Sequence, residues 1–248
     1  QVNPGNPASY SKLDSLTFIF DLGVSGHYAS YSDGLNKQNF YNGNLDYIAM
    51  QFPVLNKVGA SIGLLPYSKT GYNYGQTRTL EDIVYEEVFR GTGGLSQVYA
   101  GIAYEPLPYF SVGANVSYLF GNFSYSSVSV PRTATGATVG EEKKAYSIRD
   151  LKYDFGAQFT FPIDKASSLT VGAVYSPKLT SKADVYATEM MFLSDPYTNP
   201  YQNPSEVLRD DTLSNQHFQL PTTYGLGATY SNTNLLVGVD GTFQHWNG

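Results

Sequence analysis

Hydrophobic and polar residues alternate along most of this chain, and the alternation is clearest in the segment LKYDFGAQFTF at 151–161. Successive side chains of a β-strand point to opposite faces, so Tyr153 and Phe155 share one face while Lys152 and Asp154 share the other. The pattern therefore predicts a strand with one apolar and one polar face. The apolar face of such a strand contacts either a protein core or lipid.

The same alternation recurs through the sequence, which predicts about nine strands in all. The further segments lie at 16–24, 44–52, 57–64, 97–105, 110–120, 167–176, 222–231 and 234–246. The facing of the second of these is not assigned, because its pattern is weaker. No repeat of fixed length is visible in the sequence, so what recurs is the strand pattern and not a repeated sequence unit.

The connections between these segments are long and short in strict alternation. The long ones lie at 32–43, about 67–96, 121–147 and about 182–219, and the short ones at 54–57, 105–109, 162–167 and 231–234. Short turns at one rim and long loops at the other are typical of outer-membrane barrels, whereas a soluble β-sandwich has no reason to sort its loops by length. The sequence therefore predicts an all-β fold, a transmembrane antiparallel up-and-down β-barrel in the bacterial outer membrane. We expect the long loops, around Tyr74, Thr135 and Asn199, to be external.

In such a barrel the apolar face of 151–161 contacts lipid, and its polar face lines the lumen. Aromatic residues at or near the strand ends are then expected to form the girdles at the two membrane interfaces. These residues are Tyr104, Tyr118, Phe161, Tyr175 and Tyr230.

Composition and charge exclude several other classes of protein. The chain has 248 residues, of which 42% are hydrophobic and 15% charged, so we expect a folded, β-rich protein. The formal net charge of -6 and the lack of a basic stripe argue against a nucleic-acid partner. The absence of cysteine excludes disulfides, thiolate metal sites and cysteine nucleophiles. No apolar run reaches the roughly 20 residues that a membrane-spanning helix needs.

Few residues carry recognisable chemistry. Ser25 and His27 share a strand face, but no third group accompanies them and GVSGH is not a nucleophile elbow, so a polar lumen wall is the favoured interpretation. The carboxylate pairs at 81–82, 86–87 and 210–211 lack the spaced oxygen ligands of a calcium site. GTGG, which begins at position 91, lacks the Lys-Ser/Thr of a phosphate loop. We therefore predict no catalytic residue, no metal and no cofactor, and we expect that the protein is not an enzyme.

Three stretches of the sequence resemble the FadL-like outer-membrane transporters of hydrophobic compounds, in their Bacteroidetes form. They are GNPASYSKLDSLTF at 5–18 and the segments 91–122 and 220–246. The resemblance implies a barrel of about fourteen strands with a plugged lumen, through which apolar molecules pass inward by a side opening. It implies that residues 1–14 are the end of an N-terminal hatch and that residues 15–248 are a partial barrel. Because nine is an odd number of strands, we expect a piece of a longer protein.

Two functions follow as hypotheses. The first is uptake of hydrophobic small molecules, for which Ile19, Leu65, Tyr99 and Leu119 on the otherwise polar face would provide an apolar lining. These four side chains would alternatively pack against the hatch. The second function is a structural barrel subunit of a larger outer-membrane machine for secretion or barrel assembly. The partners expected are outer-membrane lipid and lipopolysaccharide, a hydrophobic ligand for the first function, and other outer-membrane proteins for the second.

Pro66 is the last candidate site residue. It follows an apolar run, and proline cannot donate a hydrogen bond to a neighbouring strand, so pairing should be interrupted there. In the family that the sequence resembles, such a defect forms the side opening. The simpler alternative is that Pro66 ends its strand at the outer rim.

Overall fold

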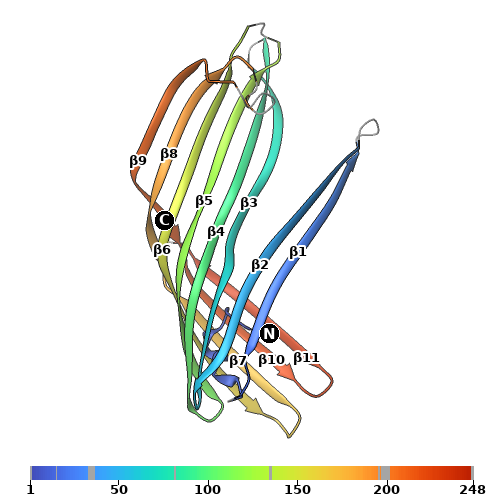
Figure 1. Ribbon diagram of the computed structural model, residues 1–248, viewed down its shortest axis with the longest axis vertical. Helices are drawn as coiled ribbons and strands as arrows, with labels where there is room; N and C mark the ends of the chain where they lie inside the picture. Colours follow the sequence, from blue (N-terminus) through green and yellow to red (C-terminus); the bar gives the residue numbers. More distant parts are fainter. Residues whose placement is uncertain are drawn as a thin grey trace.

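The computed structural model describes residues 2–14, 16–32, 37–80, 82–133, 136–194, 196 and 202–246. These residues form one antiparallel sheet of 11 strands, preceded by a short 3-10 helix, η1 (Pro7–Lys12) (Figure 1). The strands are β1 (Ile19–Ser32), β2 (Lys37–Leu55), β3 (Val58–Leu80), β4 (Ile83–Leu107), β5 (Phe110–Pro131), β6 (Val139–Pro162), β7 (Ser168–Ser176), β8 (Leu179–Phe192), β9 (Glu206–Leu220), β10 (Thr222–Ser231) and β11 (Leu236–His245). No helix in the described part of the chain is long and apolar enough to cross a membrane.

The strands follow the up-and-down order that the sequence predicts, and each strand from β1 to β6 pairs with the next. β7 and β8 lie on the same side of β6, where they pair with its residues 155–162 and 139–148. β10 and β9 pair with β7 and β8 in turn. β7 with β8, and β9 with β10, are therefore two long strands that are each interrupted once. Counted in this way, the 11 strands make nine consecutive legs, which is the predicted number.

Proline causes both interruptions. Pro177 lies between β7 and β8, and Pro221 lies between β9 and β10. Leu179 pairs with Leu220, and Ser176 on the other side of the break has Thr223 opposite it, so the two breaks lie side by side. Since proline has no N–H to give to a ladder, the sheet bends where the two prolines meet.

The predicted long loops are wrong over most of their length, because strands occupy them. The segment 67–96, expected to be one loop, contains the end of β3, a tight connection and the first part of β4. Strands likewise extend into the segments 32–43, 121–147 and 182–219. Thr135 and Asn199, which mark two of the predicted loops, lie outside the described residues, whereas Tyr74 lies in β3.

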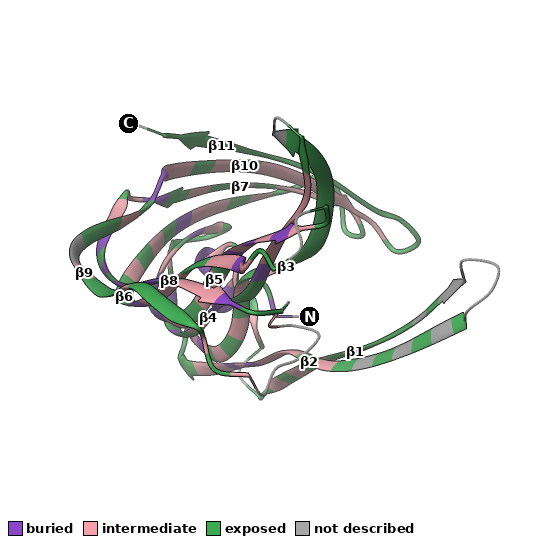
Figure 2. Cartoon of the chain, turned by 90° about the horizontal axis from the view of Figure 1, so that it is seen from above, coloured by how far each residue is buried: buried purple, intermediate pink, exposed green. Residues whose placement is uncertain are grey.

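The sheet is strongly curved but does not close. Among the described residues β1 pairs only with β2 and β11 only with β10, so both lateral edges of the sheet are free (Figure 2). The all-β class and the antiparallel up-and-down topology are confirmed. The closed barrel that the sequence predicts is not formed by these residues, because no strand bridges the two edges.

The curvature gives the sheet a convex and a concave face, and the predicted facing of 151–161 is confirmed. Tyr153 and Phe155 are exposed, whereas the side chains of Lys152 and Asp154 on the concave side are largely buried. The convex face carries many more exposed apolar side chains, among them Phe20, Leu22, Ile62, Leu64, Val98, Ile102, Val112, Val116, Val171, Leu226, Val237 and Val239.

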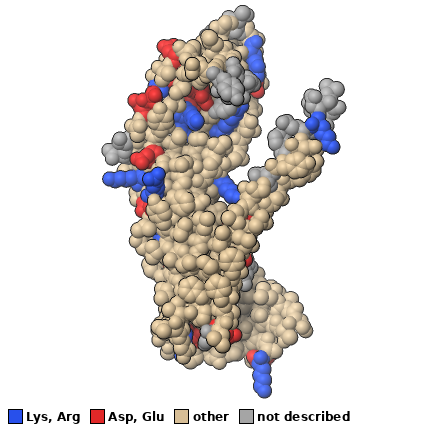
Figure 3. Space-filling view, viewed as in Figure 1, with Lys and Arg blue, Asp and Glu red and all other residues tan. Residues whose placement is uncertain are grey.

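The burial of apolar side chains changes along the strands. The basal half is the part beside the N-terminal segment, and it consists of residues 58–65, 96–107, 110–120 and 149–162 together with β7, β10 and β11. The distal half consists of the remainder of β3 to β6 together with β8 and β9. In the distal half one buried apolar cluster, which contains Leu95, Ile148 and Val185, is on the concave face. A second cluster, formed by Val128, Val130, Val139 and Phe192, is on the face that is convex in the basal half. Charged side chains gather on the visible surface of this half (Figure 3). The basal surface in the same view is almost free of charge.

Irregularities of the backbone lie in β3 and β4 near the boundary between the two halves. The β3–β4 register shifts between Pro66 and Ser68. Gly93 in β4 has a φ of 105°, and an added Cβ there would lie 2.2 Å from the carbonyl oxygen of Asn122. Only glycine fits such a position. Together with the two proline breaks, these features let the distal half bend relative to the basal half.

Candidate functional site

The N-terminal segment, residues 2–14, lies against the concave face of the basal half, where η1 contacts β2 to β6 (Figure 2). The helix begins at Asn6, whose side-chain oxygen accepts a hydrogen bond from the Ala8 amide at 3.1 Å. Pro7 follows at the first helical position, where an N–H would have no partner in the helix. The side-chain amide of Asn6 donates to the Ala157 carbonyl at 3.4 Å, which ties the cap to β6. The assignment of residues 1–14 to a larger hatch stays a prediction.

Buried hydrogen bonds fix this segment to the sheet. The Tyr10 hydroxyl donates to Oδ1 of Asn115 at 3.1 Å, and Nδ2 of Asn115 donates to the Pro4 carbonyl at 3.0 Å. The side-chain amide of Gln51 donates to the Tyr10 carbonyl at 3.2 Å. Burial, together with the nearby Tyr99, raises the pKa of Tyr10 far above its usual range, so its hydroxyl keeps the proton it donates.

A row of small residues makes room for the segment. Gly59, Ala103, Gly113 and Gly156 lie opposite one another on β3, β4, β5 and β6. A Cβ at Gly59 would lie 1.9 Å from the Tyr10 carbonyl oxygen, and one at Gly113 would lie 2.6 Å from the carbonyl carbon of Pro7. Sequence reasoning missed this seat, although glycine or alanine at inward positions of four consecutive strands is a signal that could have found it.

Three of the predicted site residues contact this segment. Ile19, Leu65 and Tyr99 belong to one cluster with Val2 and Tyr10. The hydroxyl of Tyr99 also shares a 2.8 Å hydrogen bond with Ser61. These side chains therefore pack in part against the chain itself, as the alternative of packing against a hatch expects, although Leu65 also faces a cavity.

Leu119, the fourth predicted residue, lies in a separate cluster higher in the fold. It lies at the distal end of the basal half, is 0% exposed, and packs against side chains of β4, β6, β8 and β9. The buried members of this distal cluster are Leu95, Leu119, Ile148, Ala183, Val185 and Leu220. The concave interior is thus filled at two levels, by the N-terminal segment in the basal half and by the distal cluster above it.

Pro66 lies inside β3, so the expectation that it ends the strand is wrong. The interruption of pairing expected there is present on one side: the β2–β3 ladder reaches Ile48 opposite Leu64 and extends no further among the described residues. β3 continues to pair with β4 as far as Leu80. Beyond this point the β1–β2 hairpin projects away from β3 (Figure 1). We call the space between β2 (37–47) and β3 (66–80) the lateral gap.

A cavity of about 900 Å³ lies on the concave side, between the N-terminal segment, the base of the lateral gap and strands β6, β7, β10 and β11. Leu65, Pro66 and Gln97 line one wall, and Lys152 and Asp154 line another. The last two form an ion pair, and the Asp154 carboxylate also accepts a hydrogen bond from Ser176. Two further carboxylates, Asp46 and Asp240, also line the cavity.

The remaining sequence candidates have structural partners. The Ser25 hydroxyl donates to Asp46 at 2.9 Å. Glu86 pairs with Arg132, Glu87 with Arg78 and Asp211 with Arg209, while Asp210 accepts from the Tyr186 hydroxyl. Glu81 lies outside the described residues. In the part of the chain that the structure covers, no group of His, Asp and Glu is arranged to hold a metal ion.

The glycine-rich stretch at 91–94 also has a structural explanation. A Cβ at Gly91 would lie 2.2 Å from the Tyr72 ring, and Gly93 has the positive φ described above. The glycines therefore accommodate an aromatic ring and a bend in β4.

The described residues form a curved antiparallel sheet with an apolar convex face, which defines an all-β protein. The model of one family, BamG, matches residues 1–248, so the chain belongs to the BamG family, a family of the barrel-assembly machinery. No curated protein and no solved structure matches the chain. The family match overturns the resemblance to FadL-like transporters.

Proposed function

We propose that this protein is a structural subunit of an outer-membrane barrel-assembly complex, and that it is not an enzyme. The observation that carries the proposal is the match of the BamG family model to the whole chain. The geometry supports it, because the concave interior is filled by the N-terminal segment and by the distal cluster. A transporter needs a continuous path for its substrate, and two filled levels oppose one.

In this role the basal half lies in the outer membrane. Its convex face is apolar, and a band of about 25 Å of outward apolar residues is typical of membrane barrels. The distal half projects into water, because charged side chains gather on its surface and its apolar clusters are buried. The surfaces left for other subunits are then the free strand edges and the walls of the lateral gap.

The test is purification of the native protein from outer membranes in a mild detergent. A tag is inserted in the exposed turn at Thr233, away from the N-terminal seat, and copurifying proteins are quantified by mass spectrometry. We expect stoichiometric recovery of other barrel-assembly proteins. The control is an unrelated outer-membrane barrel with the same tag.

Depletion of the protein provides the second measurement. We expect lower amounts of many folded outer-membrane barrels and unchanged uptake of a labelled long-chain fatty acid relative to the amount of its transporter. Recovery of a monomer, together with loss of fatty-acid uptake alone, would contradict the proposed function.

A further inference from the structure

The lateral gap is bounded by two strand edges that face each other. β2 and β3 pair up to Ile48 and Leu64, and on the far side of that point each is paired only with its other neighbour in the described structure. Each edge therefore presents a row of backbone N–H and C=O groups toward the gap. Such edges are templates for pairing with another strand.

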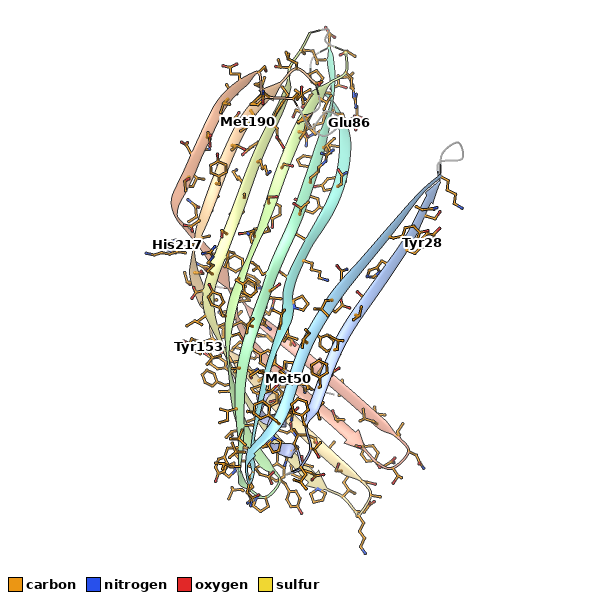
Figure 4. All side chains as sticks on the ribbon, in the orientation of Figure 1. Tyr28, Met50, Glu86, Tyr153, Met190 and His217 are labelled. Atoms are coloured by element: carbon orange, nitrogen blue, oxygen red, sulfur yellow. The ribbon has the colours of Figure 1, made fainter. Side chains whose placement is uncertain are left out.

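The β1–β2 hairpin beyond residue 24 also lacks support. It is a ribbon of two strands, and Val24, Tyr28 and Tyr41 on one of its faces are exposed (Figure 4, where Tyr28 is labelled). An isolated two-stranded ribbon is marginally stable in water. The projecting hairpin is thus expected to need a further strand or surface beside it.

Closure of the gap by β2 itself is opposed by irregularities on both sides. On β3, Pro66 has no N–H to donate, and the register with β4 shifts between Pro66 and Ser68. On the hairpin, the register of β1 with β2 shifts between Gly23 and Val24. A ladder continued from Ile48 and Leu64 would meet both defects at its first steps.

The chemistry of the β3 edge indicates what fits beside it. Tyr72 and Tyr74 are 40% and 59% exposed, and they stack with Tyr125 and Phe89 on one face of the sheet. Aromatic side chains of this kind favour aromatic or β-branched neighbours on the next strand. Residues 68–80 contain Lys69 and Arg78 but no carboxylate, and these two bases already pair with Asp46 and Glu87. A basic side chain in the neighbouring strand would therefore find no carboxylate on this stretch of β3.

Glycines with open space around them lie at the walls of the lateral gap. A Cβ added at Gly26, Gly43 or Gly71 would meet nothing within 4 Å, whereas Gly59, Gly91 and Gly113 are each explained by a close neighbour. Glycine within a strand often marks a site that another backbone approaches closely. Gly26, Gly43 and Gly71 lie at the two walls of the gap, and Gly136 and Gly241, which lie elsewhere, are open in the same way.

We infer that the lateral gap is a strand-addition site, at which one extended strand of a partner protein pairs with the edge of β3 between Ser68 and Leu80. The strand carries aromatic or aliphatic side chains toward Tyr72 and Tyr74, and uncharged or acidic side chains elsewhere. The inference rests on the proposed function in placing the partner within the same assembly complex.

A photo-crosslinking amino acid tests the contact in the whole complex in cells. It is placed at Asn73 and at Thr77 on the β3 edge, with Tyr153 on the convex basal face as the control position. We expect a crosslink to a protein of the complex from the two edge positions and not from the control. Crosslinks that join β3 to β2 of the same chain, or to a second copy of the chain, would overturn the inference.

Two proline variants test whether the contact is made by the backbone. Neighbouring residues of a strand direct their N–H groups to opposite edges, so one of Thr70→Pro and Gly71→Pro removes a donor toward β4 and the other removes a donor toward the gap. The variant that keeps wild-type thermal stability is the one that alters the gap edge, and the other is its matched control. We expect the stable variant to recover about tenfold less partner, as a loss of roughly 1.4 kcal/mol in affinity would give.

The failures of the two proposals differ. If the wild-type protein copurifies with no other subunit, the proposed function fails. If the complex is intact, and the stable proline variant keeps its partner in full, the strand-addition site alone is wrong.

Discussion

The basal and distal halves of this protein are built from the same strands, but they differ in how far their apolar side chains are buried. In β5, Val116 and Tyr118 are exposed on the convex side of the basal half, whereas Leu119 at the boundary is buried on the concave side in the distal cluster. A strand in water buries its apolar face in a core, whereas a barrel strand in lipid turns its apolar face outward. The proposed function accounts for this change within single strands, with lipid around the basal half and water around the distal half.

The two halves also fill their interiors differently. The basal half has a concave face of small and polar residues, which receives the N-terminal segment. The distal half closes over its own apolar side chains, because β8 and β9 bring Val185 and Leu220 toward Leu119. The basal interior therefore depends on a separate segment, and the distal interior depends on the curvature of the sheet.

The largest effect is expected in the distal cluster. Leu119→Ala removes a fully buried side chain from between β4, β6 and β8, so it should lower the free energy of unfolding by about 2–5 kcal/mol. The measurement is urea unfolding of the protein in lipid vesicles. Val116→Ala, on the exposed convex face of the same strand, is the control and should cost much less. Equal costs would mean that the two faces do not differ in burial as described.

A charged side chain introduced on the convex face tests whether the basal and distal halves have different surroundings. Phe155→Arg should destabilise the inserted protein by about 2–4 kcal/mol, since an arginine side chain that faces lipid near mid-bilayer loses its hydration. Thr212→Arg on β9, an exposed position in the distal half, should be almost neutral. The fraction of folded protein in outer membranes, measured by heat-dependent gel mobility, gives both results. Similar losses in the two variants would place both halves in the same solvent.

The sequence predicts the basal half well, for a physical reason. Its strands contact two different environments, so apolar and polar residues alternate strictly, as in 151–161 and 110–120. In 68–80 of β3 both faces carry polar or aromatic residues, and the alternation on which the prediction depends is absent. That is why a long strand was expected to be a loop.

The site could be predicted only in part. Pro66 indicated a break in pairing, because the missing N–H is visible in the sequence. The seat of the N-terminal segment gives a weaker signal, the small inward residues of four strands, because it depends on Gly59, Gly113 and Gly156 lying opposite one another. Such register between strands comes from the folded sheet.

The seat itself gives the third prediction. Gly59→Val places side-chain atoms where the Tyr10 carbonyl lies, and overpacking of this kind costs about 1–3 kcal/mol. We expect the N-terminal segment to be displaced, so that trypsin cleaves after Lys12 faster than in the wild type. Gly225→Val in β10 is the matched control, because a Cβ there lies 3.6 Å from Val174, an ordinary contact. Unchanged cleavage in the Gly59 variant would show that the segment does not need this seat.

The smallest effect concerns one hydroxyl in the basal interior. Tyr10→Phe removes the donor to Asn115, whose side chain is buried, and should cost about 1 kcal/mol at neutral pH. Tyr153→Phe makes the same chemical change on the exposed convex face and should leave the free energy of unfolding unchanged. The comparison thus separates a buried hydroxyl from an exposed one.

The pH dependence of the stability difference between the wild type and Tyr10→Phe is a further test of the burial of this hydroxyl. Burial raises the pKa of Tyr10 in the folded protein above the value of about 10 that it has in the unfolded chain. The stabilisation that accompanies a raised pKa is fully present below the unfolded-state pKa and is lost as the pH rises from there toward the folded-state pKa. The wild type should therefore lose stability above pH of about 10 faster than Tyr10→Phe, and the difference between the two should shrink. Urea unfolding at neutral and alkaline pH measures it, and a difference that stays constant would mean that the Tyr10 hydroxyl is not buried in the folded protein.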